Sequence, residues 1–149
     1  MIIKETQPFN ALTFTTQATL PELSKYGLIG QKLCSEAERL GIESDGALQW
    51  NYFGIDGKPE TVFTLEIALP VHEKEAVVQG FESKQIPAIK CLSLVHEGPW
   101  ENLPQSYGKA MGYLSANNLT MTGECREIYA TIDLEETANN ITEIQIGIN

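Results

Sequence analysis

A carboxylate and a phenol, Glu127 and Tyr129, stand two residues apart near the C-terminal end of the sequence, in the stretch EIYATID. Side chains alternate along a β-strand, so in a strand this pair would share one face of a sheet. A carboxylate among aromatic rings can bind a cation, because it supplies the counter-charge and each ring adds about 0.5 to 2 kcal/mol of cation–π attraction. Trp50 and Tyr52 carry further rings at the same spacing. These four residues are the first candidates for a ligand site.

The two histidines give a weaker signal. His96 could act as a base, but it directly precedes the turn residues Gly98 and Pro99. We therefore favour a structural role for His96 in the turn that leads into a helix. Nothing around His72 or His96 is typical of a haem ligand, and we expect no cofactor.

The composition is that of one acidic globular domain. Its 149 residues are enough for one core but short for two independent ones. The net charge of −10 argues against binding to nucleic-acid phosphate. The sequence has no apolar run of membrane-spanning length and no secretory signal pattern, which favours a cytoplasmic location and no membrane partner. The cysteines, Cys34, Cys91 and Cys125, lack the spacing of a disulfide framework or a zinc site, so no metal is expected.

The sequence also contains an internal repeat. Shifting it by 77 residues against itself places WNYFGID (50–56) on EIYATID (127–133), so that Tyr52 falls on Tyr129. The apolar pattern agrees at the same shift, and such periodicity indicates duplicated structural units. The predicted parts of this single domain (1–149) are two halves, about residues 1–71 and 88–149, and a bridge over residues 72–87.

Each half shows the same order of secondary-structure signals. Thr19 and Glu22 have the pattern of a capping box at the start of a helix that Gly41 would end, and Asn102 and Gln105 repeat this pattern in the second half. The predicted elements are strands at 11–16, 47–55 and 61–69 with a helix at about 20–40, then strands at 88–95, 125–132 and 141–148 with a helix at about 102–117. The order (βαββ)2 predicts an α+β fold, with both helices on one face of an antiparallel sheet.

Alternation along the strands suggests which face carries a site. Three apolar rows are expected to meet the helices: Phe63, Leu65, Ile67 and Leu69; Ile144, Ile146 and Ile148; Ile128, Ala130 and Ile132. Aromatic rings, carboxylates and other polar side chains occupy the alternate positions, which are Trp50, Tyr52, Thr64, Glu66, Glu127, Tyr129, Glu143 and Gln145. We interpret these as a ligand groove on the helix-free face. The alternative is a plain polar sheet surface, which antiparallel sheets commonly turn to water.

The segment HEGPWENLPQSYGKAMGYLSANN (96–118), followed by Gly123 and by Glu127-x-Tyr129, resembles the GyrI-like (gyrase-inhibitor-like) family. That family includes the effector-binding domains of AraC-type and MerR-type multidrug-sensing regulators. The resemblance covers essentially the whole chain and implies an aromatic pocket at the pseudo-twofold seam with Glu127 buried in it. Trp100 stands where tyrosine is commoner in the family, which would reshape one wall.

Three functions are implied by the resemblance. The first is a stand-alone binding protein for lipophilic cationic or aromatic compounds, with Glu127, Tyr129, Trp50, Tyr52, Glu66 and Trp100 as ligand-binding residues. The second is a hydrolase of cyclopropane-bearing alkylating agents that uses Glu127 and Tyr129. The third is an interaction protein that engages DNA gyrase or a regulator. We prefer binding over catalysis because no nucleophile, base and orienting group are recognisable. The DNA-reading segment of the regulators is not found, so no direct nucleic-acid contact is expected. Haem, suggested by the related SOUL-type fold, is disfavoured.

Overall fold

The computed structural model describes residues 1–72 and 80–149. The predicted helices and strands follow one another in the predicted order, with two further strands and with short 3-10 helices (η) at three of the connections. The elements are β1 (Ile2–Glu5), β2 (Phe9–Ala18), η1 (Leu20–Tyr26), α1 (Ile29–Arg39), β3 (Gln49–Phe53), β4 (Phe63–Pro70), β5 (Glu82–Ile86), β6 (Lys90–Glu97), η2 (Trp100–Asn102), α2 (Leu103–Ala116), β7 (Met121–Thr131), η3 (Thr137–Asn139) and β8 (Ile141–Ile148). No helix in these two ranges is long and apolar enough to cross a membrane.

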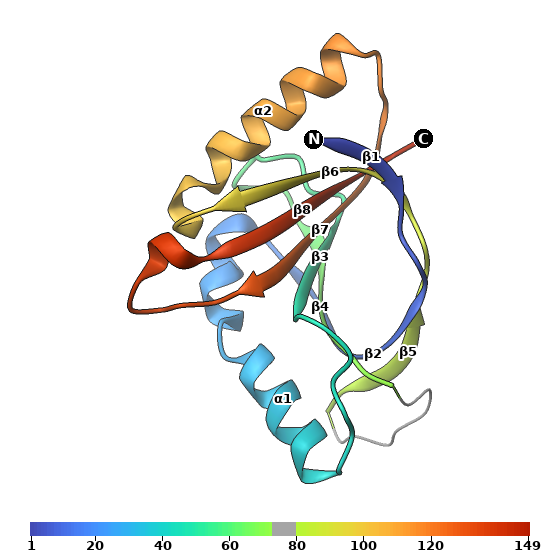
Figure 1. Cartoon of the computed structure of the whole chain (residues 1–149), viewed down its shortest axis with the longest axis vertical. Helices are drawn as coiled ribbons and strands as arrows, with labels where there is room; N and C mark the ends of the chain where they lie inside the picture. The colour runs from blue at the N-terminus through green and yellow to red at the C-terminus, as the bar shows by residue number, and fades with distance from the viewer. Residues whose placement is uncertain (73–79) are drawn as a thin grey trace.

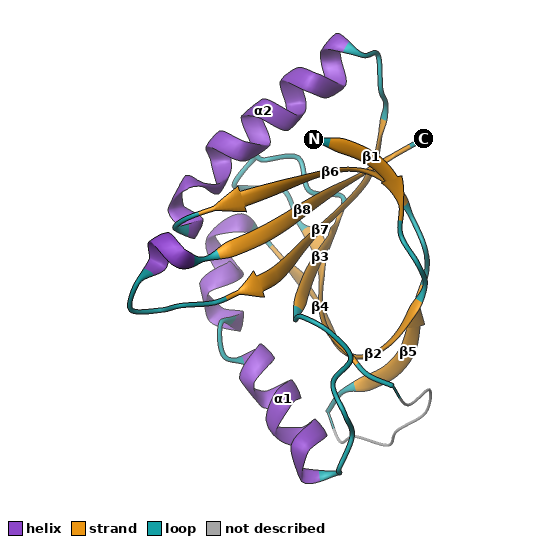
Figure 2. Ribbon diagram, in the orientation of Figure 1, coloured by secondary structure: helices purple, strands orange, loops and turns teal. Residues whose placement is uncertain are grey.

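The described strands form one sheet in the order β1-β6-β8-β7-β3-β4-β2-β5, and every neighbouring pair is antiparallel. Both α-helices lie on the same side of this sheet (Figures 1 and 2). The predicted α+β class, with helices on one face of an antiparallel sheet, is therefore confirmed.

The first predicted helix is divided into two pieces. Glu22 accepts hydrogen bonds from the backbone N–H and the hydroxyl of Thr19, at 3.0 Å each, so the predicted capping pair forms. The segment that it begins is the 3-10 helix η1, and α1 starts only at Ile29. Gly41 adopts a φ of 70° just after α1, a conformation that favours glycine and ends helices. In the second half, Asn102 precedes α2 as predicted but makes no side-chain cap hydrogen bond.

Two strands, β1 and β5, were not predicted. β5 lies within the predicted bridge 72–87, of which residues 73–79 fall outside the described residues. The backbone N–H of Thr6 donates to the carbonyl of Ile89 and the N–H of Ile89 donates to Thr6 Oγ1, both at 2.8 Å. These bonds join the β1–β2 connection to the β5–β6 connection. The segments β1–β2 and β5–β6, joined by these bonds, curve around the side of the sheet opposite the helices (Figure 1).

The strand register agrees with a tandem duplication. Trp50 of β3 lies directly opposite Glu127 of β7, and Phe9 of β2 lies opposite Ile86 of β5. In each pair the partners are the two residues that the 77-residue shift superposes. Pairing of equivalent residues is what a twofold axis between two repeats requires. The pseudo-twofold axis therefore passes beside Glu127.

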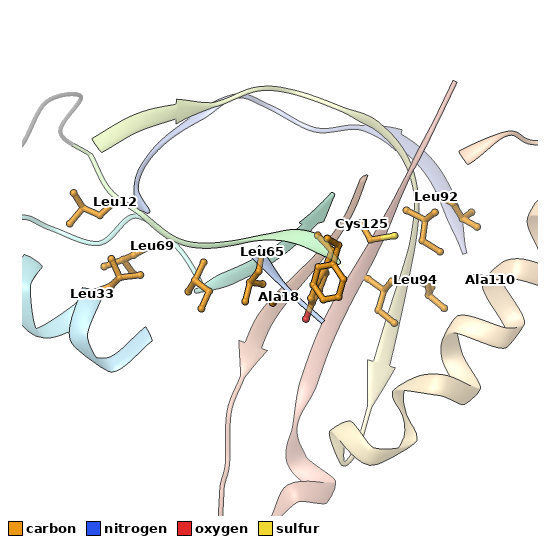
Figure 3. Close-up of a cluster of buried hydrophobic side chains, with 14 of the residues drawn as sticks. Leu12, Ala18, Leu33, Leu65, Leu69, Leu92, Leu94, Ala110 and Cys125 are labelled. Carbon is orange, nitrogen blue, oxygen red and sulfur yellow. The ribbon is translucent and has the colours of Figure 1, made fainter. Parts of the chain in front are cut away.

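The main hydrophobic core lies between the sheet and the helices. Figure 3 shows its side chains along this side of the sheet, from Leu33 of α1 to Ala110 of α2. The rows of β4 and β8 that were predicted to meet the helices are fully buried in this core. The predicted row of Ile128, Ala130 and Ile132 is wrong, because this row lies on the opposite face and Ile132 is 48% exposed.

The opposite face of the sheet carries buried polar groups. Glu66, only 4% exposed, forms an ion pair with Lys84 and accepts a hydrogen bond of 3.1 Å from Asn51. Glu143 likewise pairs with Lys4 at 2.6 Å. A charge removed from water is costly unless it is paired, and these pairs meet that requirement.

Arg126 is the largest fully buried side chain of the described residues, with 1% exposure. Its Nε lies 2.6 Å from Glu124 Oε2, and its Nη2 donates to the carbonyl of Pro87 at 2.8 Å. Arg126 thus connects β7 to the segment between β5 and β6 across this polar face.

Candidate ligand-binding pocket

A pocket of about 570 Å³ lies on the helix side of the sheet, among η1, α2, β3 and β7. The apolar part of its wall is formed by Leu20, Leu23, Ile55, Leu103, Pro104, Met111, Met121 and Cys125. The volume falls within the range of about 300 to 1,000 Å³ that is typical of small-molecule sites. A drug-sized molecule would therefore fit.

Glu127 is the buried carboxylate of this pocket, with 6% exposure. Three phenols donate hydrogen bonds to it: Tyr52 to Oε1 at 3.1 Å, Tyr129 to Oε1 at 2.7 Å and Tyr107 to Oε2 at 2.5 Å. The bonds from Tyr129 and Tyr107 are in the short range of hydroxyl donors to a carboxylate, whereas the bond from Tyr52 is longer. No lysine, arginine or histidine within residues 1–72 and 80–149 forms an ion pair with it.

The three phenols are held in their protonated form. Burial raises the pKa of Tyr52, Tyr107 and Tyr129 well above the ordinary value, and the adjacent charge of Glu127 raises it further. A phenol of raised pKa remains a hydrogen-bond donor and is a poor base. The three tyrosines therefore serve to hold the carboxylate.

We expect these three tyrosines to resist ionisation above pH ~10, where a free phenol titrates. An absorbance titration should find fewer phenolates in the folded protein than in urea, where all five tyrosines are free. Because folding raises these pKa values, the stability contributed by the phenols is complete below pH ~10 and is lost as the pH rises through the folded values. Titration of all five tyrosines with a common midpoint at pH ~10, with an unchanged circular dichroism spectrum, would contradict this arrangement.

The rings of two tryptophans, Trp50 and Trp100, pack against the ring of Tyr129. The ring of Trp100 meets Tyr129 at 5.5 Å and 65°, and that of Trp50 meets it at 6.4 Å and 85°. Edge-to-face contacts at these distances are favourable for aromatic pairs. Trp100 is fixed further, since its Nε1 donates to Thr142 Oγ1 at 3.1 Å. The tryptophans thus hold a tyrosine that in turn holds Glu127.

The comparison with known families identifies this architecture. Residues 1–149 match the GyrI-like small molecule binding domain. The chain belongs to the GyrI-like family. Among curated proteins, no sequence matches this GyrI-like domain.

Several solved structures share its fold. EcmrR in its complex with DNA superposes with a TM-score of 0.83 and 20% identity over 99% of this chain. This GyrI-like domain spans only 56% of that EcmrR chain. The separately solved EcmrR C-terminal domain has a TM-score of 0.79 and 20% identity. That alignment covers 99% of this chain and 96% of the C-terminal domain.

Two more distant structures carry ligand or activity information of their own. SAV2435 bound to tetraphenylphosphonium has a TM-score of 0.64 and 10% identity, with coverage of 99% of this chain and 93% of that one. A hydrolase encoded by lin2189 from Listeria innocua has a TM-score of 0.66 and 12% identity, with coverage of 99% and 91%. At such identities the similarity establishes the fold alone.

In the structure of the GyrI-like domain, some of the predicted site residues lie together and others do not. Glu127, Tyr129 and Tyr52 meet as expected, whereas Trp50 and Trp100 contact Tyr129 and are not in the pocket wall. Two predictions are corrected. The pocket lies on the helix side, since Glu127 is bonded to Tyr107 of α2, and Glu66 faces the other side of the sheet.

Sequence reasoning missed Tyr107 and the wall formed by η1 and α2. The repeat offers a signal for Tyr107, because the 77-residue shift places it on Gly30 of α1 and places Glu127 on Trp50. A Cβ at Gly30 would collide with the side chain of Leu48, so no larger residue fits there without rearrangement. Only one half of the duplication therefore combines a carboxylate with a phenol from its helix.

His96 has a structural position in this domain. Its Nδ1 lies 2.7 Å from Ser106 Oγ and its Nε2 lies 2.9 Å from the carbonyl of Pro99. These contacts connect the end of β6 to the first turns of α2. His96 therefore helps to orient the helix that carries Tyr107. Among the described residues, no group of three His, Cys, Asp or Glu side chains could hold a metal ion.

Proposed function

We propose that this GyrI-like domain binds lipophilic organic cations in the pocket beside Glu127. The observation that carries the proposal is a 94% buried carboxylate, held by three phenols, that forms no ion pair with the described part of its own chain. The phenols offset part of the cost of burying the charge, but they bring no positive charge. A cationic ligand would provide the missing counter-charge.

The remainder of the pocket favours an apolar ligand body. Leucines from η1 and α2 offer a large apolar area, and Met111 and Met121 add flexible side chains that adapt to different shapes. Selection would then depend on positive charge and approximate size more than on individual hydrogen bonds. The structure of SAV2435 with tetraphenylphosphonium gives this proposal support through the shared fold.

The proposal is tested with two ions of the same shape and opposite charge. Calorimetric titration should show saturable binding of tetraphenylphosphonium. The matched control is tetraphenylborate, which we expect to bind about 10- to 100-fold more weakly, since a charged contact of about 1.5 to 3 kcal/mol is lost. Equal affinity for the two ions would show that the buried carboxylate does not select the ligand.

Hydrolysis of a strained ring, the second candidate, has support from the carboxylate itself, which could activate a water molecule. The Listeria innocua hydrolase shares the fold. The other groups in the pocket are less suited to catalysis. The raised pKa values of the tyrosines disfavour them as bases, and burial raises the pKa of the Cys125 thiol to about 12. Binding thus requires fewer assumptions than turnover, and a protein partner such as gyrase or a regulator stays the third alternative.

A further inference from the structure

Gly108 occupies the interior of α2, where glycine is a poor choice for a helix. It stands at the sixth of the fourteen residues of Leu103–Ala116. Glycine loses more backbone freedom than alanine on entering a helix, so it weakens the element that contains it. An isolated glycine inside a helix is tolerated, but at a cost in stability.

Packing does not require a glycine at this position. A Cβ built on Gly108 meets nothing within 4 Å, and the residue is exposed to solvent. Its backbone is not among those with positive φ, so conformation does not require glycine either. A Cβ could therefore be added here without a collision.

The location of Gly108 in the pocket wall suggests another reason. Pro104, Gly108 and Met111 are spaced four and three residues apart, so they follow one side of α2, and all three line the pocket. The preceding residue, Tyr107, is hydrogen-bonded to Glu127. A side chain at position 108 would stand at the pocket wall between Pro104 and Met111. Because glycine has no side chain, the space at this position stays unfilled and adjoins the proposed ligand site.

We propose that Gly108 keeps this part of the pocket open and determines the width of the cation that the domain accepts. The inference rests on the proposed function and specifies its ligand class: broad, non-planar cations with several rings. A larger residue at position 108 would exclude such cations while still admitting slim ones.

The same helix contains a matched control, Gly112. It lies one turn beyond Gly108, it is exposed, and a Cβ there also meets nothing within 4 Å. Unlike Gly108, it is not part of the pocket wall. Replacing either glycine by leucine should stabilise α2 to a similar degree, because leucine is the better helix former. Any difference in ligand binding between the two variants then reflects the pocket.

The test compares Gly108→Leu and Gly112→Leu with the unchanged protein, using tetraphenylphosphonium as the broad cation and 1-butylpyridinium as the slim one. Calorimetry should show that Gly108→Leu weakens tetraphenylphosphonium binding about tenfold or more, as expected when a filled site is overpacked. Binding of 1-butylpyridinium to that variant should change by less than about twofold, as should binding of both cations to Gly112→Leu.

The other outcomes contradict the inference in different ways. If Gly108→Leu binds both cations as before, or loses both equally, Gly108 does not select by width. If the unchanged protein binds neither cation, the proposed function fails before the variants are compared. Thermal unfolding checks that each variant is folded. If Gly108→Leu is not, Gly108→Ala and Gly108→Ser replace it, and they should still weaken the broad cation more than the slim one.

Discussion

Replacing Glu127 by glutamine is expected to weaken tetraphenylphosphonium binding about 10- to 100-fold, because a buried ionic contact is worth about 1.5 to 3 kcal/mol. Glutamine has nearly the same shape and keeps an oxygen that accepts from the phenols. The variant therefore removes the charge and little else. Calorimetric titration of both proteins measures the difference.

A matched control for this variant is Glu38→Gln. Glu38 is an exposed residue of α1, so its replacement changes the net charge of the protein by the same amount and leaves the pocket intact. Its affinity for the cation should stay within about twofold of the original. Similar losses in the two variants would mean that overall charge, and not Glu127, attracts the ligand.

The same variant distinguishes binding from hydrolysis. If the pocket hydrolyses neutral cyclopropane-bearing compounds, Glu127→Gln should still bind the substrate but lose turnover, because the charge would then be needed mainly in the transition state. If the substitution leaves cation affinity unchanged and neither protein shows turnover, Glu127 has no role in cation binding or in hydrolysis. The partner-binding alternative would then be preferred.

Arg126→Met is expected to be strongly destabilising, at about 3 to 5 kcal/mol in the free energy of unfolding. Arg126 is buried, and its loss leaves Glu124 and the carbonyl of Pro87 without their partner. Methionine retains the unbranched stem, so the change removes chiefly the charge and its hydrogen bonds. Urea unfolding followed by circular dichroism measures it.

Two further variants make this prediction specific. Arg39→Met removes an arginine from an exposed pair with Glu36 on α1 and should leave the unfolding free energy nearly unchanged. Adding Glu124→Gln to Arg126→Met should recover part of the loss, because the unpaired charge is then removed as well. A double variant no more stable than Arg126→Met would show that the pairing with Glu124 is not the cause.

The family, the α+β class and most of the elements could be predicted from the sequence. The stretch from His96 to Asn118 with Glu127-x-Tyr129 carried the resemblance, and the 77-residue repeat carried the tandem architecture. The strands β1 and β5 could not be predicted because each is short and is stabilised by pairing with a distant partner. The sequence also singled out Glu127, Tyr129 and Tyr52, which the structure joins by hydrogen bonds.

The face that carries the candidate pocket could not be predicted from the sequence and follows from how the strands pair and pack. Alternation correctly separated Glu127 from Ile128 and Glu66 from Ile67, but it relates residues within one strand and not between strands. The polar rows of different strands were assigned to one face because they are polar, which placed Glu127 on the same face as Glu66. The register instead places Glu127 opposite Ile144 and Trp50, in the row that packs against the helices.

The physical reason for this failure is the site itself. The buried carboxylate of Glu127 breaks the rule that polar rows face away from the core, and such breaks are expected at sites like the one proposed here. Its cost is offset by phenols that come from three different elements, Tyr52 of β3, Tyr129 of β7 and Tyr107 of α2. Tyr107 is twenty residues from Glu127 in the sequence. The packing of α2 on the sheet, which no local pattern specifies, brings the two side chains together.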